Sequence, residues 1–269
     1  MQIDIIKLIE SNLIAIVTFM IGLLPGLYVG IKSWLKYRNF VKVFGQSAKD
    51  HKNIAIIFPE WKVKKMSRDG TRFEKVLPDG TIEKYYGPDE TVSYDDLKGG
   101  KEISHIFSEF LSEPIEYIYD TKDIADTEKK TLIMIGSPLA NYRARIIYES
   151  VEEIQFDYVE KEETKDYPAG CANRDKIENK EYHSIDKWQY SVITRIPSSN
   201  SGDIFHFLVS GPHAEGTYVA GAYLREHWKG FKNAELTASV LLRSPNLKNQ
   251  AEECYKFHKV IKRYGFPSK

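Results

Sequence analysis

Neither sign of charge dominates this chain, because 38 Lys and Arg residues balance 38 Asp and Glu residues. Proteins that follow a nucleic-acid backbone usually present a basic surface, so the balance argues against a nucleic-acid polymer as a partner. Cysteine is also scarce. Cys171 and Cys254 lie far apart, without CxxC spacing or a companion His cluster, which indicates neither a disulfide framework nor a zinc site. Reduced thiols fit a cytosolic domain.

The sequence also lacks the motifs of common enzymes. HExxH, GxSxG, GxGxxG and a complete phosphate-binding GxxxxGK[ST] motif are absent. Gly211 and Gly216 reproduce the GxxxxG half of the last motif, but Thr217 stands where lysine is needed. His206 and His213 have no partner at metal-ligand spacing. The sequence therefore predicts no metal and no cofactor, and it favours a binding protein over an enzyme.

One long run without charge is present near the N-terminus, at residues 13–31. Nineteen helical residues would extend about 28 Å, close to the hydrocarbon thickness of a bilayer, so the run predicts a single membrane-spanning helix. A signal peptide and a buried helix are the alternatives, although Asp4 and Glu10 precede the run where a signal peptide carries basic residues. Lys32 and Lys36 follow it. By the positive-inside rule, we expect a short N-terminus outside the cell membrane and a cytoplasmic C-terminal domain.

Within the run, Gly22, Gly26 and Gly30 recur at every fourth position. Small residues with this spacing allow two membrane helices to approach closely, which predicts a homo-oligomer. The alternative is that glycine is simply frequent in spanning helices.

Two regions follow from these patterns. Residues 1–44 form the membrane helix and its juxtamembrane linker, and residues 45–269 form a cytosolic α/β domain. Two Asp-Gly-Thr turns, ten residues apart, predict a three-stranded antiparallel meander inserted at residues 60–92. The meander is interpreted as a structural insertion, with docking to lipid or a neighbouring subunit as the alternative.

Apolar runs and helical periodicity predict a Rossmann-like, mostly parallel sheet with flanking helices. We expect residues 160–184 to form an exposed loop because they are charged and poor in aliphatic side chains. Outside the meander, strands are expected at 53–58, 115–119, 132–135, 154–159, 188–196, 204–209 and, as the last one, 236–242. Helices are expected near 103–111, 142–147, 217–228 and 249–264.

Two strand–loop–helix units carry the functional prediction. In each, a glycine-bearing loop follows an apolar strand and precedes a helix, an arrangement that offers backbone N–H groups to an anion. We therefore expect the two loops to face one another and to bind a small anionic ligand, a nucleotide being the favoured class. The residues of this predicted site are Gly136, Ser137, Asn141, Arg143, Arg145, Ser210, Gly211, His213, Glu215, Gly216 and Thr217.

Each part of this site has an alternative. The loops could simply pack helices tightly onto strands, and Arg143 and Arg145 could be ordinary solvated charges. His213 and Glu215 could form an acid–base pair, which would make the chain a membrane-tethered hydrolase of a nucleotide or glycosidic bond. A scaffold domain without a small ligand is the third hypothesis.

A membrane span followed by a Rossmann-like cytosolic domain with two Gly/Ser loops resembles bacterial membrane-anchored effectors of the antiphage signalling type. The resemblance rests on residues 132–138 (LIMIGSP) and 208–217 (LVSGPHAEGT). It implies a cytosolic domain that senses a nucleotide signal, assembly driven by that ligand, and a span that disrupts the membrane or signals through it.

Overall fold

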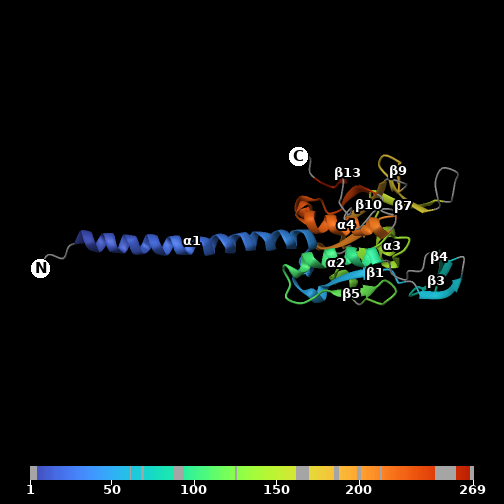
Figure 1. The fold of residues 1–269 in the computed structure, drawn as a ribbon, viewed down its shortest axis with the longest axis horizontal. Helices are drawn as coiled ribbons and strands as arrows, with labels where there is room; N and C mark the ends of the chain where they lie inside the picture. The colour runs from blue at the N-terminus through green and yellow to red at the C-terminus, as the bar shows by residue number, and fades with distance from the viewer. Residues whose placement is uncertain are drawn as a thin grey trace. The chain divides into compact units, whose positions relative to one another are not determined.

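The computed structural model describes residues 5–60, 62–67, 70–87, 94–124, 126–161, 170–184, 188–198, 201–212, 214–245 and 259–266 (Figure 1). The chain divides into two compact units, Met1–Phe40 and Val41–Lys269. The first unit is helical, and the second holds a mixed α/β structure.

The helix of the first unit, α1, runs over Ile5–Phe44, so that its last residues belong to the second unit. Pro25 lies inside it. Within the described residues, α1 is the one helix long and apolar enough to cross a membrane, by length and composition alone. The backbone at Gly22, Gly26 and Gly30 has open space around it, since an added Cβ atom would meet nothing within 4 Å.

A seven-stranded sheet forms the centre of the second unit, in the order β13-β12-β10-β11-β6-β1-β5. Three pairings are parallel (β1–β5, β1–β6, β6–β11) and three are antiparallel (β10–β11, β10–β12, β12–β13). The prediction of a mostly parallel sheet is therefore wrong, because the hairpin of β10 and β11 and the C-terminal strands β12 and β13 add antiparallel pairings to the parallel core. The strands are β1 (Ile54–Phe58), β5 (Glu116–Tyr119), β6 (Thr131–Ile135), β10 (Trp188–Ser198), β11 (Ser201–Ser210), β12 (Ala238–Pro245) and β13 (Lys259–Tyr264).

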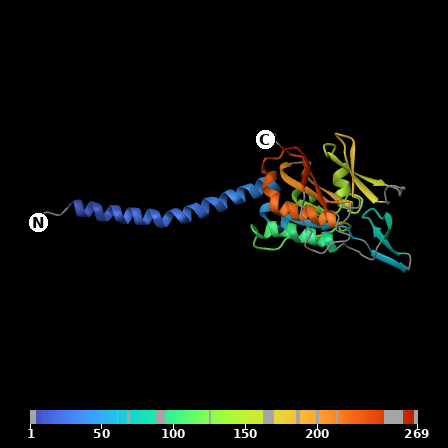
Figure 2. The ribbon, with the colours of Figure 1, turned by 45° about the horizontal axis from the view of Figure 1, so that its top comes forward.

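Apart from Thr131 at the start of β6, strands β1 and β6 are apolar throughout because both of their faces are covered. All five residues of each are buried. Helices α2 (Tyr94–Ser108) and α4 (Ala214–His227) lie side by side on one face (Figure 2), and α3 (Tyr142–Glu149) packs on the other. The two backbones of α2 and α4 touch: a Cβ atom on Gly221 would lie 2.6 Å from the carbonyl oxygen of Gly99. Glycine is therefore required at this crossing.

Two small sheets flank the large one. The predicted meander is confirmed as β2 (Lys62–Ser67), β3 (Gly70–Val76) and β4 (Ile82–Gly87), which pair antiparallel. The second sheet consists of β7 (Phe156–Lys161), β8 (Gly170–Asp175) and β9 (Lys180–His183).

This second sheet contradicts the expectation of an exposed loop over residues 160–184, because residues 170–175 and 180–183 are strands. For residues 162–169 the expectation lies outside the described residues. The charged composition is misleading because polar side chains are buried with partners. The carboxylate of Asp175 is fully buried and accepts hydrogen bonds from Lys262 (3.0 Å) and Tyr264 (2.7 Å) on β13. Burial raises the pKa of Asp175, but the hydrogen bonds from Tyr264, Lys262 and the backbone N–H groups of Glu178 and Ile177 together lower it below its usual value.

The C-terminal end also differs from expectation. Strand β12 is not the last strand, and residues 259–264, expected within a helix, form β13 at the edge of the large sheet. The residues that alternate along β13 decide this outcome: Lys262 and Tyr264 reach Asp175 from one face. The rest of the predicted helix, residues 249–258, lies outside the described residues.

His206 lies in the middle of the sheet on β11 and is buried. Its Nδ1 atom accepts a hydrogen bond from the backbone N–H of Leu132 (3.4 Å), so the ring is neutral. Burial lowers the pKa of His206 to about 4. Since the unfolded chain then binds a proton that the folded chain does not, this residue lowers stability as the pH falls from its usual pKa towards 4.

We expect this residue alone to remove about 2 kcal/mol of unfolding free energy between about pH 7 and pH 5. In His206→Asn, an amide oxygen replaces Nδ1 as the acceptor but does not titrate. Urea unfolding of the full-length chain in detergent should therefore show a shallower loss of stability with acid in the variant. Equal losses in both proteins would contradict the prediction.

Candidate functional site

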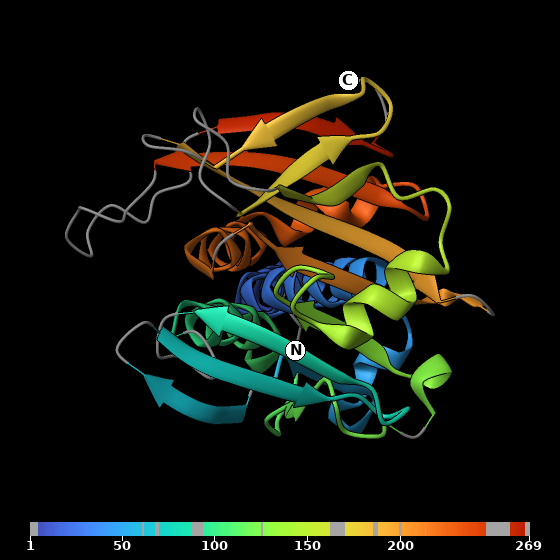
Figure 3. The same cartoon turned by 90° about the vertical axis from the view of Figure 1, so that its right-hand side faces the viewer.

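The two predicted loops leave the same edge of the large sheet. Strands β6 and β11 are adjacent and parallel, with Ile135 opposite Val209 at their ends. The N–H of Gly136 continues the ladder by donating to the carbonyl of Val209 (3.1 Å). Residues 136–141 and 210–217 therefore start side by side at the carboxyl ends of these strands, an edge that Figure 3 faces.

The order in which strands are added to the sheet reverses between β1 and β6. From β1 the chain crosses through α2 to β5 on one side, and it then places β6 on the other side of β1. The helices that follow the two strands cover opposite faces. In open α/β sheets, such a reversal is the usual position of a ligand-binding crevice.

Asn141 fills part of this position. Its side-chain amide nitrogen donates to the carbonyls of Ile57 (3.1 Å) and Ile135 (2.9 Å), and thus joins the ends of β1 and β6. Its side-chain oxygen accepts from the N–H of Ala144 (3.1 Å) and caps α3. Asn141 is fully buried, and Ser137 beside it is also buried. The bonds of Asn141 are those of a structural cap.

A carboxylate of the protein occupies the first turn of α3. Asp120 follows β5 and is fully buried. Its Oδ1 atom accepts from the N–H of Glu60 (2.9 Å), and its Oδ2 atom accepts from the N–H of Tyr142 (2.7 Å). The start of a helix is a favourable place for an anion because its N–H groups are free and the helix dipole is positive there. Asp120 is therefore the anion that this helix holds.

Lys75 of the meander completes the arrangement. Its ammonium group lies 2.6 Å from Oδ2 of Asp120 and also donates to the carbonyl of Ala140. Neither side chain of this ion pair is exposed. Burial lowers the pKa of Lys75, and the neighbouring Asp120 opposes that effect. A buried pair of this kind fixes the position of the meander against the edge.

The two arginines of the predicted site are engaged. Arg143 donates through Nη2 to the carbonyl of Lys122 (2.7 Å), and Arg145 donates through Nη1 to Oε1 of Glu83 (2.7 Å). Donation of this hydrogen bond to the Glu83 carboxylate raises the pKa of Arg145. The Nε and Nη2 atoms of Arg145, like Nε of Arg143, are buried without a hydrogen-bond partner in the described structure.

The second loop is held differently. The hydroxyl of Ser210 is buried and hydrogen-bonds with that of Tyr158. Gly216, in the first turn of α4, is packed closely, since an added Cβ atom would lie 3.2 Å from Cα of Gly211. Thr217 is buried and Glu215 is half-buried. His213 lies outside the described residues, so the suggested His213–Glu215 pair is not described.

A buried polar group lies beneath this start of α4. Gln189 and Ser244 are directly opposite one another on β10 and β12, so they share a face, and Ser191 follows on the same face by strand alternation. The added Cβ atom of Gly216 would lie 3.7 Å from Oε1 of Gln189, which places this face under α4. The hydroxyls of Ser191 and Ser244 are buried and have no hydrogen-bond partner in the described structure. Unsatisfied buried hydroxyls are uncommon and require an explanation.

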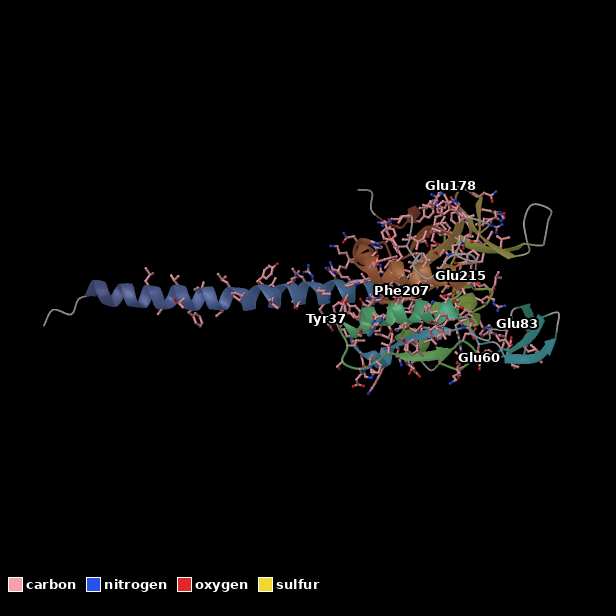
Figure 4. All side chains as sticks on the ribbon, in the orientation of Figure 1. Tyr37, Glu60, Glu83, Glu178, Phe207 and Glu215 are labelled. Atoms are coloured by element: carbon pink, nitrogen blue, oxygen red, sulfur yellow. The ribbon has the colours of Figure 1, made fainter. Side chains whose placement is uncertain are left out.

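The sequence thus predicted that the two loops leave one edge of the sheet, but it did not point to Asp120 or Lys75 at that edge. Asp120 directly follows a predicted strand, and that position was a usable signal. Lys75 gives none, because a lysine in an alternating hairpin normally points to solvent. Figure 4 shows Glu60, Glu83 and Glu215 toward the same end of the unit. Among the described residues, no group of three His, Cys, Asp or Glu side chains could hold a metal ion.

The fold and the site define an α/β protein with one helix able to span a membrane. No protein-family model, curated protein or solved structure matches the chain.

Removing one partner of the Lys75–Asp120 pair should be costly. We expect Lys75→Met to lower the unfolding free energy by about 3–5 kcal/mol, because it leaves a buried carboxylate without its cation. The double variant Lys75→Met/Asp120→Asn should be more stable than Lys75→Met, since the remaining group is neutral. Denaturant unfolding of the full-length chain measures both.

Lys129→Met is the matched control, because Lys129 forms the same type of pair with Asp126 at an exposed position (68% and 58% exposed). It should have little measurable effect. A cost for Lys75→Met no larger than that of the control would contradict the assignment of the pair as buried and specific.

Proposed function

We propose that the chain is a membrane-anchored cytosolic sensor that binds a small anionic ligand, with nucleotides as the first class to test, at the edge shared by β6 and β11. One observation carries the proposal. The parallel pairing of β6 with β11 starts both glycine-bearing loops side by side, next to the point between β1 and β6 where the strand order reverses. We also propose that the α/β unit is a Rossmann-like domain.

The geometry favours the α4 half of this edge for the ligand's anionic group. In the α3 half, Asp120 already holds the helix N-terminus, and Asn141 joins the strand ends. The α4 half combines a fourteen-residue helix with the hydroxyl of Ser244, which has no partner in the described structure. An oxygen of a phosphate or carboxylate would satisfy this hydroxyl and the first turn of α4 together.

The membrane part of the proposal rests on α1. We place its N-terminus outside and the α/β unit in the cytoplasm, because Lys32, Lys36 and Arg38 follow the apolar run. Ligand binding would favour one state of the cytosolic unit, and the span would transmit this population shift or act on the bilayer. Self-association through Gly22, Gly26 and Gly30 would provide the assembly step.

A nucleotide panel tests ligand binding on the full-length chain in detergent micelles. At least one nucleotide should raise the thermal unfolding temperature and remain intact. Ser244→Ala should slightly raise the unfolding temperature without ligand, because it removes an unsatisfied buried hydroxyl. The same change should weaken binding by roughly three- to tenfold, because it removes a hydrogen bond to the ligand.

Ser239→Ala on the same strand is the control. The Ser239 hydroxyl is buried but hydrogen-bonds with Thr194 (3.0 Å) and Gln155 (3.2 Å), so its loss should cost about 1 kcal/mol of stability and leave binding unchanged. The sensor proposal fails if no nucleotide shifts the unfolding temperature. If the protein hydrolyses the ligand and Glu215→Gln abolishes that hydrolysis, the hydrolase hypothesis replaces the sensor proposal.

The membrane topology has its own test. The full-length chain should remain with membranes after carbonate extraction, and protease added outside spheroplasts should leave a C-terminal tag intact. Leu24→Arg should move a large part of the chain to the soluble fraction, since arginine at a helix centre costs about 2.5–3.5 kcal/mol on insertion. Leu24→Ile should not. Digestion of the tag by protease added outside would contradict the proposed topology and indicate the opposite orientation.

A further inference from the structure

The meander is attached to the second unit in an unusual way. Its three strands hydrogen-bond with one another in a sheet of their own, separate from the seven-stranded sheet. Side chains make the contact with the body instead: Lys75 reaches Asp120 and Ala140, and Glu83 reaches Arg145. Figures 1 and 3 show the meander at the end of the unit from which the two loops leave.

The two meander residues in these contacts are directly opposite one another. Lys75 on β3 pairs with Glu83 on β4, so both side chains leave the same face of the hairpin. On the body, Asp120 lies at the end of β5 and Arg145 lies on α3. The result is a chain of alternating charge in the order Arg145, Glu83, Lys75, Asp120, which we name the charge clamp.

We infer that the meander is a latch over the carboxyl edge of β1 and β6, closed by the charge clamp and able to open as a unit. Opening would carry Lys75 and Glu83 away and expose Asp120, Arg145 and the first turn of α3. The opening itself needs no ligand. Whether a ligand controls the opening rests on the proposed function. In that case the meander is the element that moves when the site is filled.

The chemistry of the clamp explains why it would be reversible. A buried ion pair gives specific geometry but little net stability, because rehydration of both charges offsets much of the attraction lost on opening. Burial already lowers the pKa of Lys75, which reflects this cost of desolvation. The hairpin pair next to the clamp adds little apolar burial: Val76 and Ile82 are 49% and 54% exposed, and Leu77 after them is the buried apolar residue at this place.

The outer pair of the clamp also has unused bonding capacity. Oε2 of Glu83 and the Nε and Nη2 atoms of Arg145 are buried without a partner in the described structure, although one bidentate pairing would satisfy an oxygen and a nitrogen together. The Arg145 and Glu83 side chains are 30% and 22% exposed, so water or a ligand reaches this pair first. Opening would therefore begin at Arg145–Glu83 and proceed to Lys75–Asp120.

Hydrogen exchange on the full-length chain tests the latch. Glu83→Arg places a cation against Arg145 and beside Lys75, and should speed exchange of the amides in residues 70–87 by roughly three- to tenfold. Exchange in residues 131–135 and 204–210 should stay unchanged, because the large sheet remains folded. Adding Arg145→Glu restores an opposite pair and should return much of the lost protection.

Arg225→Glu is the matched control. Arg225 on α4 pairs with Glu102 on α2, away from the meander, so its reversal should leave exchange in residues 70–87 unchanged. Equal acceleration across the meander and the large sheet in Glu83→Arg would overturn the latch, since the pair would then support only global stability. No acceleration in the meander would overturn it as well.

The same experiment separates the latch from the proposed function. Exchange is measured again with each member of the nucleotide panel. If the variants open the meander but no nucleotide alters exchange or thermal unfolding, the latch stands and the sensor proposal fails. If a nucleotide binds while the variants leave the meander protected, the sensor proposal stands and the latch fails.

Discussion

The carboxylate of Asp120 connects three separate segments of the second unit. It accepts N–H groups from Glu60, after β1, and from Tyr142, at the start of α3, and it pairs with Lys75 on the meander. These segments are far apart in the chain, and they meet where β1 and β6 end. The position of α3, the closure of the edge and the attachment of the meander all depend on this one buried group, which is stable only because each of its bonds is made.

A contrast between the two halves of the edge follows from this constraint. Around α3, the helix start already holds a negative charge, although buried N–H groups of Arg143 and Arg145 have no partner in the described structure. Around α4, the hydroxyls of Ser191 and Ser244 lie buried beneath the first turns without a partner in the described structure. The protein's own carboxylate fills one helix start, and hydroxyls without a partner lie beneath the other. The two loops are therefore chemically different, although their sequences look alike.

The sequence allowed much of the core and the location of the edge to be predicted, for a physical reason. Strands buried on both faces, such as β1 and β6, must be apolar throughout, and loops after parallel strands must meet at one edge. Local patterns failed where buried polar groups decide the structure. Asp175 holds β8 against β13 through Lys262 and Tyr264, so a charged tract became a strand and an expected helix became an edge strand. Lys75 was missed for the same reason, since its burial depends on a partner 45 residues away.

The crossing of α2 and α4 has a consequence for how change could spread through the unit. Where Gly99 meets Gly221, main chain rests on main chain, with no side chain between them to change rotamer and absorb a shift. The two helices are therefore in direct backbone contact and form one rigid layer across one face of the sheet. A displacement at the first turn of α4 would therefore act directly on the backbone of α2, and substitution at either glycine would push the two helices apart.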